Sequence, residues 1–395
     1  MTKPIAVIVG AGIAGLSAAW WLDKAGWTSV VVERDDALRA SGYSMTISGL
    51  GHETVQHMDL LAELQSVSQH FEYNIISDGY GRELCRIRYV DVHGGGLEAL
   101  PVRRDELARL LAKHLPSSAS IRFRETVREF ADQGDKVRVV LAGGDTIEAD
   151  LLIGADGFRS QIRRTLWKGR EDDFLEHLGY YYAAYNFSNR QTESQQDHDC
   201  YSFNRPGQLD MLFSLREKGL TCMNIWREER DLSTTGTSKE AKFDILRQVT
   251  AQSVPQVRDA VEQAEQADAL VTLDSLTLVT LPRWSEGRVL LLGDAAHCLT
   301  LLSGQGAGMA LVSAEILGKE LQKTPDDVLE ALRNHEAKLR PAIERLQARS
   351  KRMADMFIPK SSWAYYFRNL VLKVLPYSWI VGFHVSSVKS EIDLT

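Results

Sequence analysis

The pattern of apolar and polar positions predicts a strand, a helix and a second strand at the start of the chain. The apolar run Ile5 to Val9 is typical of a fully buried parallel strand. An Ala- and Leu-rich helical pattern then extends to Lys24, and a β-branched run, Ser29 to Val32, ends at Glu33. This order predicts a βαβ unit with parallel strands.

The segments between this unit and residue 153 alternate between strand and helix patterns. Asp36 to Gly51 is predicted to be a loop, and Glu53 to Leu64 has apolar residues at helical spacing. Ile87 to Leu100 is predicted to form strands that turn at Gly94-Gly95-Gly96. Arg103 to His114 is predicted to be an amphipathic helix, followed by strands from Ile121 to Ile153.

The pattern changes in the middle of the chain and again towards its end. Strand-like segments with many aromatic residues extend from about Phe174 to Thr280, interrupted by a helical stretch from Lys239 to Ala269. Arg288 to Leu292 is again a predicted buried strand, and a helix is predicted from Ala307 to Gln322. The remainder is predicted to be helical, with breaks at Pro325, Pro341, Pro359 and Pro376.

The glycine residues after the first strand predict a dinucleotide site. Gly10, Gly12 and Gly15 have the G-x-G-x-x-G spacing, which suits a tight turn, close approach to a pyrophosphate and close helix–strand packing. The helix N-terminus adds free N–H groups and partial positive charge. Glu33 ends the second strand, where its carboxylate can accept ribose hydroxyls but would repel a 2′-phosphate. The alternative is a glycine-rich turn in an ordinary βαβ unit.

Two further motifs follow predicted strands. The first is Asp156-Gly157-Phe158-Arg159-Ser160, with Arg163 after it. The second is Gly293-Asp294-Ala295-Ala296-His297, followed by the glycine loop Ser303 to Gly306. An aspartate at the end of a strand can accept from a ribityl or ribose hydroxyl, and a helix N-terminus can stabilise negative charge on a flavin. Each motif alone could be a structural turn, but the three in this order favour a flavin.

From Ile5 to Gln347 the chain resembles the class A flavoprotein monooxygenases, the p-hydroxybenzoate hydroxylase-like family. The resemblance implies that the first glycine loop holds the FAD pyrophosphate and Glu33 the adenosine ribose. It implies that Asp294 binds the ribose or ribityl chain, that Gly304 to Ala307 lie along the isoalloxazine, and that Asp156 and Arg163 serve FAD and NAD(P)H together. The expected cofactor-binding residues are Gly10, Gly12, Ala14, Gly15, Glu33, Arg34, Arg39, Arg104, Asp156, Asp294, Gly304, Gly306 and Ala307. Arg39 could equally be a surface arginine.

The resemblance completes the predicted architecture. We expect an α/β protein with a Rossmann-like FAD-binding domain, an inserted mainly-β substrate domain and a C-terminal helical extension. Because 395 residues is long for one core, two interlocked domains are expected. The expected boundaries are 1–173 and 281–345 for the two parts of the FAD-binding domain, 174–280 for the substrate domain and 346–395 for the extension.

Within the family, the chain is most similar to the tetracycline-inactivating and the polyketide- or aromatic-hydroxylating members. The segment Cys298 to Ala310 and the extended C-terminus carry this similarity. The chain departs from many relatives where Thr300-Leu301 replaces a pair of prolines, Gly308 replaces an asparagine and Thr46 replaces a loop acid. These departures affect the expected placement of the substrate and leave the expectation of FAD binding in place.

The implied activity is that of a monooxygenase that uses FAD, NADH or NADPH, and O₂. A flavin C4a-hydroperoxide would hydroxylate an aromatic or polyketide-like small molecule, held in a site that excludes water. No acid–base pair stands out, and His297 is expected to pack near the cofactor. Residues that could line the substrate pocket are Tyr181, Tyr185, Phe203, Met211 and Phe213, about half of which are expected to be plain core instead. The alternatives are a flavin-dependent reductase or halogenase, although the W-x-W-x-I-P signature of halogenases is absent, or a non-catalytic flavin- or ligand-binding protein.

Composition and charge argue against several other classes. Hydrophobic residues at 44% and charged residues at 25% are ordinary for a globular enzyme. A net charge of −7 provides no basic excess for nucleic acid. Four scattered cysteines and ten histidines without an H-E-x-x-H pattern predict neither a disulfide framework nor a metal site. Met1 leads directly into the first strand without a signal peptide, and no apolar stretch is long enough to span a bilayer, so a cytoplasmic protein is expected.

The segment Pro359 to Val385 is predicted to present a broad apolar helical face, because Trp363, Tyr366, Phe367 and Leu370 recur at helical spacing. Such a face needs a cover. It could pack across the junction of the two domains, against a second subunit of a homodimer, or on a membrane surface. Few basic residues flank it, which disfavours the membrane.

Overall fold

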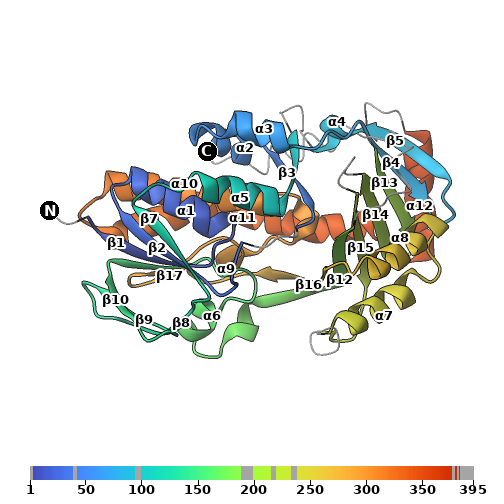
Figure 1. The fold of residues 1–395 in the computed structure, drawn as a ribbon. Helices are drawn as coiled ribbons and strands as arrows, with labels where there is room; N and C mark the ends of the chain where they lie inside the picture. Colours follow the sequence, from blue (N-terminus) through green and yellow to red (C-terminus); the bar gives the residue numbers. More distant parts are fainter. Residues whose placement is uncertain are drawn as a thin grey trace.

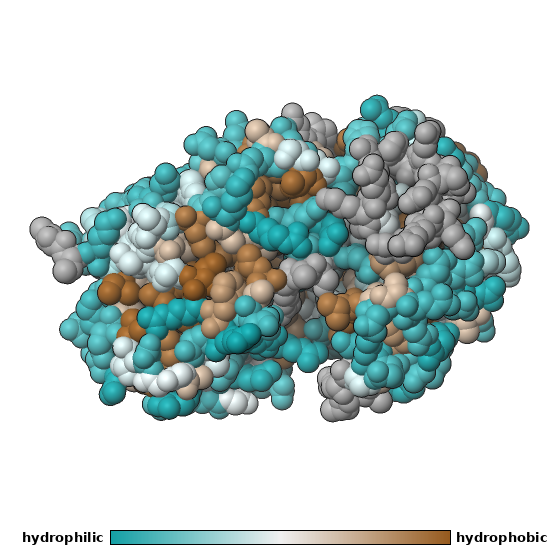
Figure 2. Space-filling model, viewed as in Figure 1, coloured by the Kyte–Doolittle hydropathy of each residue, from teal (hydrophilic) through white to brown (hydrophobic). Residues whose placement is uncertain are grey.

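The computed structural model describes residues 3–38, 42–93, 99–187, 199–214, 219–232 and 238–375, together with Trp379 and Gly382. The predicted turn at Gly94-Gly95-Gly96 and the candidate residue Arg39 lie outside the described residues. Two sheets dominate the fold and lie at opposite ends of the molecule (Figure 1). In the same view, apolar residues gather near the middle of the surface (Figure 2).

A six-stranded sheet carries the N-terminal motif. Its strand order is β17-β18-β11-β1-β2-β7. The bounds are β1 (Ile5–Val9), β2 (Thr28–Glu33), β7 (Ala119–Phe123), β11 (Leu151–Gly154), β17 (Ser285–Glu286) and β18 (Val289–Leu291). Every pair is parallel except β17 with β18. Because parallel strands end at the same edge of a sheet, the segments that follow β1, β11 and β18 meet there.

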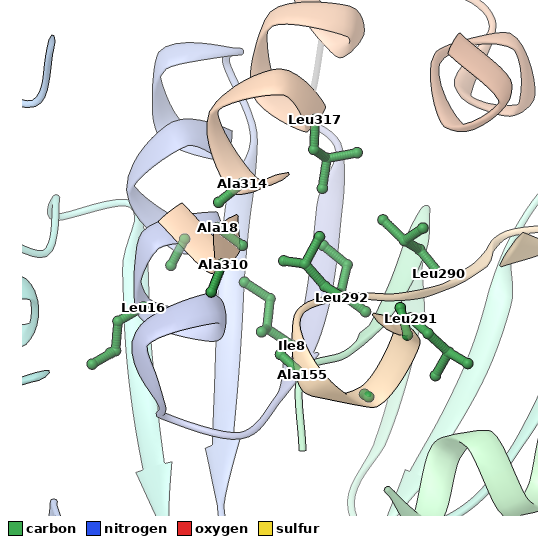
Figure 3. Packing of buried hydrophobic residues seen from close by; sticks show 14 of the residues in the cluster. Ile8, Leu16, Ala18, Ala155, Leu290, Leu291, Leu292, Ala310, Ala314 and Leu317 are labelled. Atoms are coloured by element: carbon green, nitrogen blue, oxygen red, sulfur yellow. The ribbon is translucent and has the colours of Figure 1, made fainter. Parts of the chain in front are cut away.

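The main core lies between this sheet and two long helices. The helices are α1 (Ile13–Lys24) and α10 (Gly306–Lys323). Figure 3 shows Ala18 of α1 beside Ala310 of α10, with Ile8 of β1 beneath them. Ile8 and Leu16 are completely buried, and each such side chain contributes about 1.5–3 kcal/mol through removal from water.

Glycine residues let α10 approach its neighbours closely. A Cβ on Gly318 would lie 2.8 Å from the Cβ of Trp21, so α10 contacts α1 at the level of the backbone. On its other side, α10 contacts α2 (Leu50–His57). A Cβ on Gly51 of α2 would lie 2.6 Å from the Cα of Gly308. Helix α10 is therefore held against α2 at its first turn and against α1 nearer its C-terminal end, in both places without an intervening side chain.

The second large sheet has seven strands in the order β16-β12-β15-β14-β13-β4-β5. Its strands are β4 (Tyr73–Asp78), β5 (Glu83–Arg88), β12 (Leu175–Phe187), β13 (Cys200–Arg205), β14 (Gln208–Ser214), β15 (Leu220–Arg227) and β16 (Val271–Val279). Helices α7 (Lys239–Thr250) and α8 (Pro255–Gln266) pack on one face.

The predicted α/β fold with a mainly-β second part is confirmed. The boundaries at 174 and 280 remain a prediction, and the sheet itself recruits β4 and β5 from before them because β13 pairs with β4.

The other elements complete these two halves. The remaining strands are β3 (Ser44–Ser48), β6 (Ala99–Arg103), β8 (Val127–Asp132), β9 (Val137–Leu141) and β10 (Thr146–Ala149). The remaining helices are α3 (Leu61–Val67), α4 (Tyr89–His93), α5 (Arg104–Lys113), α6 (Gln161–Leu166), α9 (Asp294–His297), α11 (Val328–Phe357) and α12 (Ser362–Val374). The short 3₁₀ turns are η1 (Glu171–Phe174) and η4 (Leu301–Ser303). No described helix is long and apolar enough to cross a bilayer.

Three local predictions were wrong. The predicted loop 36–51 contains strand β3, which pairs with β6 far along the chain. The predicted strands at 87–100 include helix α4, because Tyr89 packs its ring against Phe71, a contact that local pattern does not reveal. Pro341 lies inside α11 and does not break it, since Leu339, Ala342 and Ile343 around it are buried in tertiary contacts.

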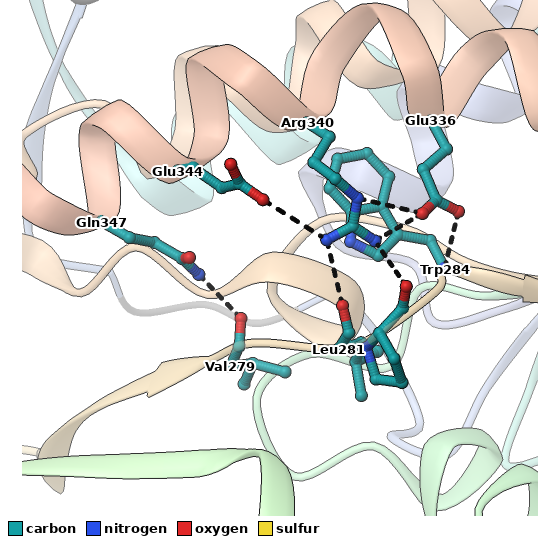
Figure 4. Close-up of polar contacts among 8 residues, drawn as sticks. Val279, Leu281, Trp284, Glu336, Arg340, Glu344 and Gln347 are labelled. Carbon is teal, nitrogen blue, oxygen red and sulfur yellow. Dashed lines mark hydrogen bonds and ion pairs between the residues drawn. The ribbon is translucent and has the colours of Figure 1, made fainter.

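Side-chain contacts bind helix α11 to the segment between β16 and β17. Arg340 donates to the carbonyl of Leu281 at 3.1 Å, and its guanidinium lies 5.1 Å from the ring centroid of Trp284 (Figure 4). Arg340 also pairs with Glu336, whose carboxylate accepts the N–H of Trp284 at 2.8 Å. These contacts hold α11 against residues 281–284.

We predict that Arg340→Ala lowers the free energy of unfolding by about 1–3 kcal/mol, because charged hydrogen bonds and a partly buried ring contact are lost together. The measurement is the urea midpoint at constant m-value. Arg333→Ala on the exposed side of the same helix is the matched control and should change stability by less than about 0.5 kcal/mol. Equal decreases in the free energy of unfolding of the two variants would contradict a stabilising role of the Arg340 contacts.

Candidate functional site

A cavity of about 1130 Å³ lies between the two sheets. It is bounded by the carboxyl edge of the six-stranded sheet, by the inner face of the seven-stranded sheet and by α12. Sites for single drug-sized ligands span roughly 300–1,000 Å³, so this cavity has room for a large ligand and a second molecule beside it.

Most of the residues predicted to bind a cofactor line this one cavity. They are Gly12, Ala14, Arg34, Arg104, Asp156, Asp294, Gly304, Gly306 and Ala307. Gly10 and Gly15 lie behind the first loop, and Glu33 contacts that loop from β2. Segments that are almost 300 residues apart in sequence therefore converge because β1, β11 and β18 end at the same edge.

The three glycines of the first loop have distinct geometries. Gly10 has φ +107°, and a Cβ there would lie 2.5 Å from the carbonyl oxygen of Ala155. A Cβ on Gly15 would lie 2.0 Å from the carbonyl oxygen of Gly10. A Cβ on Gly12 would meet no atom within 4 Å. Gly10 and Gly15 thus permit the tight turn, whereas Gly12 leaves open space on the cavity side at the N-terminus of α1, as a bound phosphate requires.

Glu33 and Arg34 lie at one end of this loop. The Glu33 carboxylate accepts the N–H of Ala11 at 2.8 Å and the N–H of Asp35 at 3.1 Å. These bonds hold the carboxylate against the glycine loop. Arg34 extends into solvent, with its guanidinium 3.8 Å from the Asp35 carboxylate.

Asp156 has one satisfied and one unsatisfied carboxylate oxygen. Its Oδ2 accepts the N–H groups of Gln161 at 2.7 Å and Ile162 at 3.2 Å, at the start of α6. Its Oδ1 is buried without a hydrogen-bond partner. A buried acceptor without a donor costs about 1–3 kcal/mol, which a hydroxyl of a bound ligand would recover.

Arg163 lies behind the cavity wall, between two of the motifs. Its side chain is completely buried and is not part of the cavity wall. The guanidinium donates to the carbonyl of Ala295 at 3.0 Å and to the carbonyl of Phe158 at 2.6 Å. Arg163 therefore joins the motif after β11 to the motif after β18.

Asp294 lies in the cavity with Arg104. Burial raises the pKa of Asp294, and the Arg104 guanidinium and the Cys298 thiol partly offset that increase. The pKa of Arg104 is raised, first by the neighbouring Tyr43 hydroxyl and then by Asp294, with burial acting in the opposite direction. The pair therefore places a carboxylate and a guanidinium at the same wall, where each can bond to polar groups of a ligand.

Two tyrosines at this wall were missed by sequence reasoning. The rings of Tyr43 and Tyr182 make an edge contact at 6.4 Å, and both line the cavity. Burial raises the pKa of both hydroxyls. Tyr43 reaches this position because the N–H of Arg104 donates to its carbonyl at 3.2 Å. Nothing in the local pattern around Tyr43 indicated that contact.

The second glycine loop forms the floor of the cavity. Gly304 has φ +67° and Gly306 begins α10, and a Cβ at either position would meet no atom within 4 Å. Thr300 has φ +58° and a buried hydroxyl without a partner. A β-branched residue with positive φ is strained, and such strain is concentrated at functional sites.

The residues predicted for the substrate pocket are divided between the two faces of the sheet. Met211 and Phe213 line the cavity. Tyr185 and Phe203 instead pack in the core beneath α7 and α8, and Tyr181 borders both. Tyr185 and Phe203 are therefore core residues, because the face that each strand residue occupies depends on register.

Helix α12 borders the cavity at the β5 edge of the seven-stranded sheet. The Tyr365 hydroxyl donates to the carbonyl of Asn204 at 2.9 Å and accepts the N–H of Gly79 at 3.1 Å. Val371, Leu372 and Leu375 line the cavity. The outer apolar side has no cover within the described part of the chain, and Trp363, for example, is 76% exposed.

The chain matches the family described as "FAD binding domain" over residues 3–333. An uncharacterised protein of Mycobacterium tuberculosis is 30% identical over 352 residues, which is 86% of this chain and 91% of the relative. The FAD-dependent monooxygenase asL4 of Sarocladium schorii is 27% identical over 398 residues, with 93% of this chain and 91% of the relative covered.

Solved structures share the whole fold. The tetracycline destructase Tet(51) has a TM-score of 0.81 at 22% identity, covering 100% of this chain and 99% of the other. Klebsiella pneumoniae HpxO, complexed with FAD and uric acid, has a TM-score of 0.82 at 21% identity, covering 98% of this chain and 97% of the other. At these identities the likeness establishes the fold.

His297 is buried and does not line the cavity. Its ring lies 4.7 Å from the ring of Trp284, and burial lowers the pKa of His297 to about 4. The unfolded chain takes up this proton below about pH 6.5, while the folded chain resists until about pH 4. Stability contributed by the neutral ring is thus lost as the pH falls through this interval.

We predict that His297→Asn makes the free energy of unfolding less sensitive to pH between 6.5 and 4 than in the parent. Urea unfolding at a series of pH values measures this slope. Trp284→Phe disturbs the same packing but keeps the histidine, so it should lower stability at every pH and retain the parent's slope. Identical slopes in the parent and His297→Asn would contradict the titration of this ring.

Proposed function

The chain belongs to the FAD-binding family whose relatives are flavin-dependent monooxygenases, and on this premise we propose that it uses NADH or NADPH to hydroxylate an aromatic or polyketide-like small molecule. The observation that supports this proposal best is the single cavity that joins three cofactor motifs to an apolar sheet face. The sequence contains one dinucleotide-binding fingerprint. This is consistent with one permanently bound FAD and a nicotinamide cofactor that binds only transiently.

The residues at the carboxyl edge fit FAD. We propose that the open space at Gly12 and the N-terminus of α1 receive the pyrophosphate, with Ala14 beside it. Glu33 and Arg34 would lie at the adenosine end. The unsatisfied Oδ1 of Asp156 and the carboxylate of Asp294 would accept hydroxyls, and Arg104 would donate.

The second loop would support the flavin ring. Gly304 and Gly306 have no atom within 4 Å of an added Cβ, so a flat ring can approach the backbone there, with Ala307 at the start of α10. The N-terminus of α10 favours negative charge on a ring placed against it. Gly10 and Gly15 serve the site indirectly by allowing the turn that carries Gly12.

When bound and reduced, the flavin supplies the activation of O₂. The residues of this chain bind, orient and exclude water. Met211, Phe213 and Met223 give an apolar wall that suits a ring and keeps water away from it. Tyr43 and Tyr182 border the same space with hydroxyls that burial keeps neutral.

The solved neighbours support a ring compound as substrate. One is a tetracycline destructase, and the HpxO structure contains uric acid together with FAD. A reductase or halogenase on the same scaffold, or a flavin-binding protein without catalysis, are the competing functions, and the products distinguish them.

We predict that Asp294→Ala weakens FAD binding by about ten- to a hundredfold, because a charge-assisted hydrogen bond is worth about 1.5–3 kcal/mol. Titration of the flavin-free protein with FAD, followed by flavin fluorescence, gives Kd. Asp259→Ala removes the same charge from an exposed position on α8 and should leave Kd unchanged. A variant that binds FAD as tightly as the parent would exclude Asp294 as a contact.

We further predict that one oxygen atom of isotope-labelled O₂ enters the product when the protein turns over a ring compound with NAD(P)H. A panel of phenols, polyketides, tetracyclines and purines tests the substrate class by mass spectrometry. Label found only in water or hydrogen peroxide across the panel would count against hydroxylation. A chlorinated or a reduced product would instead identify the halogenase or the reductase.

A further inference from the structure

The seven-stranded sheet spans the cavity from the cofactor motifs to α12. Its edge strand β16 contacts α9, which begins with Asp294. Its opposite edge strand, β5, contacts α12. A substrate that lies along this face therefore has one end towards the proposed flavin position and the other end towards α12.

The chemical character of the sheet face changes along this path. The central strands β14 and β15 present Leu209, Met211 and Ile225 to the cavity. Beyond them, β13 and β4 present Ser202 and Asn74, whose side chains are hydrogen-bonded at 3.0 Å. Asn204 of β13 also lines the cavity. The wall is thus apolar in the middle, and near α12 it carries these polar side chains among apolar ones such as Ile76 and Ile87.

Arg368 of α12 adds a positive charge at this polar end. Its guanidinium donates to Oδ1 of Asn204 at 3.0 Å, to the carbonyl of Phe357 at 3.0 Å and to Oδ1 of Asn369 at 2.8 Å. A weaker contact reaches the carbonyl of Met356 at 3.5 Å. Every one of these acceptors is neutral. Arg368 itself lines the cavity.

No carboxylate forms an ion pair with Arg368 in the described part of the chain. The nearby acids are already engaged: Asp78 pairs with Arg82 at 2.8 Å, and Asp355 pairs with Lys360 at 3.0 Å. The titratable groups that act on Arg368 are the Tyr365 hydroxyl and the Cys85 thiol, and burial keeps the pKa of that thiol raised, to about 11.

A half-buried guanidinium remains charged at every pH in which the protein is folded. Placing such a charge in a cavity wall without a counter-charge is unfavourable, and an anion that binds there relieves the cost. The planar fork of arginine also matches the two oxygens of a carboxylate.

We propose that Arg368, with Asn204, Ser202 and Asn74 beside it, binds an anionic oxygen group of the substrate at the end of the cavity remote from the flavin motifs. The inference rests on the proposed function and narrows its substrate class. The substrate is a ring compound with an apolar body and an acidic group, such as a carboxylate, at the end that does not react. Arg368 orients that body along the sheet, so it determines specificity.

Matched aromatic probes test this proposal by binding alone, without NAD(P)H or turnover. Biphenyl-4-carboxylate and its neutral amide, together with the corresponding naphthalene pair, are titrated into the FAD-bound protein, and the flavin absorbance is followed. The parent should bind each acid more tightly than its amide. Arg368→Gln should weaken binding of the acid by about ten- to a hundredfold and that of the amide by less than about threefold.

Three further variants separate recognition from helix docking, because the hydrogen bonds of Arg368 also hold α12. Asn204→Asp keeps an acceptor for Arg368 but supplies a counter-charge, so it should remove the preference for the acid while α12 stays in place. Arg368→Lys keeps the positive charge but lacks the planar guanidinium, so this variant should retain part of the preference for the acid over the amide. Lys373→Gln, an exposed position on the same helix, removes an equal charge and should behave like the parent.

The proposal is overturned if the parent binds the acids no better than the amides, including the case in which neither binds. It is also overturned if Arg368→Gln weakens both probes equally, which would leave Arg368 a docking residue only. If the Asn204→Asp variant still binds the acids more tightly than the amides, the proposal is likewise overturned. Because these titrations require no turnover, their failure leaves the isotope test of hydroxylation intact, and failure of that test leaves the binding result intact.

Discussion

The contact between the backbones of Gly10 and Ala155 is the constraint on which the site depends. With Gly10 at φ +107°, its Cα faces the carbonyl of Ala155, and a side chain would lie 2.5 Å from that oxygen. The loop after β1 can therefore lie directly against the loop after β11. Arg163 adds the third segment by donating to Phe158 and Ala295. Three distant parts of the chain thereby form one rigid edge.

This edge supplies fixed partial charges, while the opposite wall supplies apolar surface. The N-termini of α1 and α10 point their free N–H groups towards the same cavity. The seven-stranded sheet contributes the other side with Met211 and Phe213, and α12 contributes Arg368. A cavity organised in this way separates the cofactor, the apolar body of a substrate and its polar end into three adjacent regions.

Local features were predictable from the sequence, and contacts between distant segments were not. The glycine spacing and the two aspartates that end strands each require only a few neighbouring residues, and all of them line or support the cavity. Tyr43 joins the site through a bond to Arg104, about 60 residues away, and no periodic pattern records such a bond. The recruitment of β4 and β5 depends on pairing with β13, and the faces of Tyr185 and Phe203 depend on strand register. Pro341 stays helical because tertiary packing outweighs its intrinsic cost.

The close contact between α2 and α10 has an evolutionary consequence. An added Cβ at Gly308 would meet Gly51 at 3.6 Å, an ordinary distance, whereas an added Cβ at Gly51 would come within 2.6 Å of Gly308. The two positions are thus unequal: residue 308 can acquire a small side chain, but residue 51 cannot unless α10 moves. Because α10 begins at the floor of the cavity, a larger residue at position 51 would displace the start of α10. Such a substitution would therefore require changes in the second glycine loop. We therefore expect position 51 to co-vary with residues 304–308 among descendants of this chain, although it does not line the cavity.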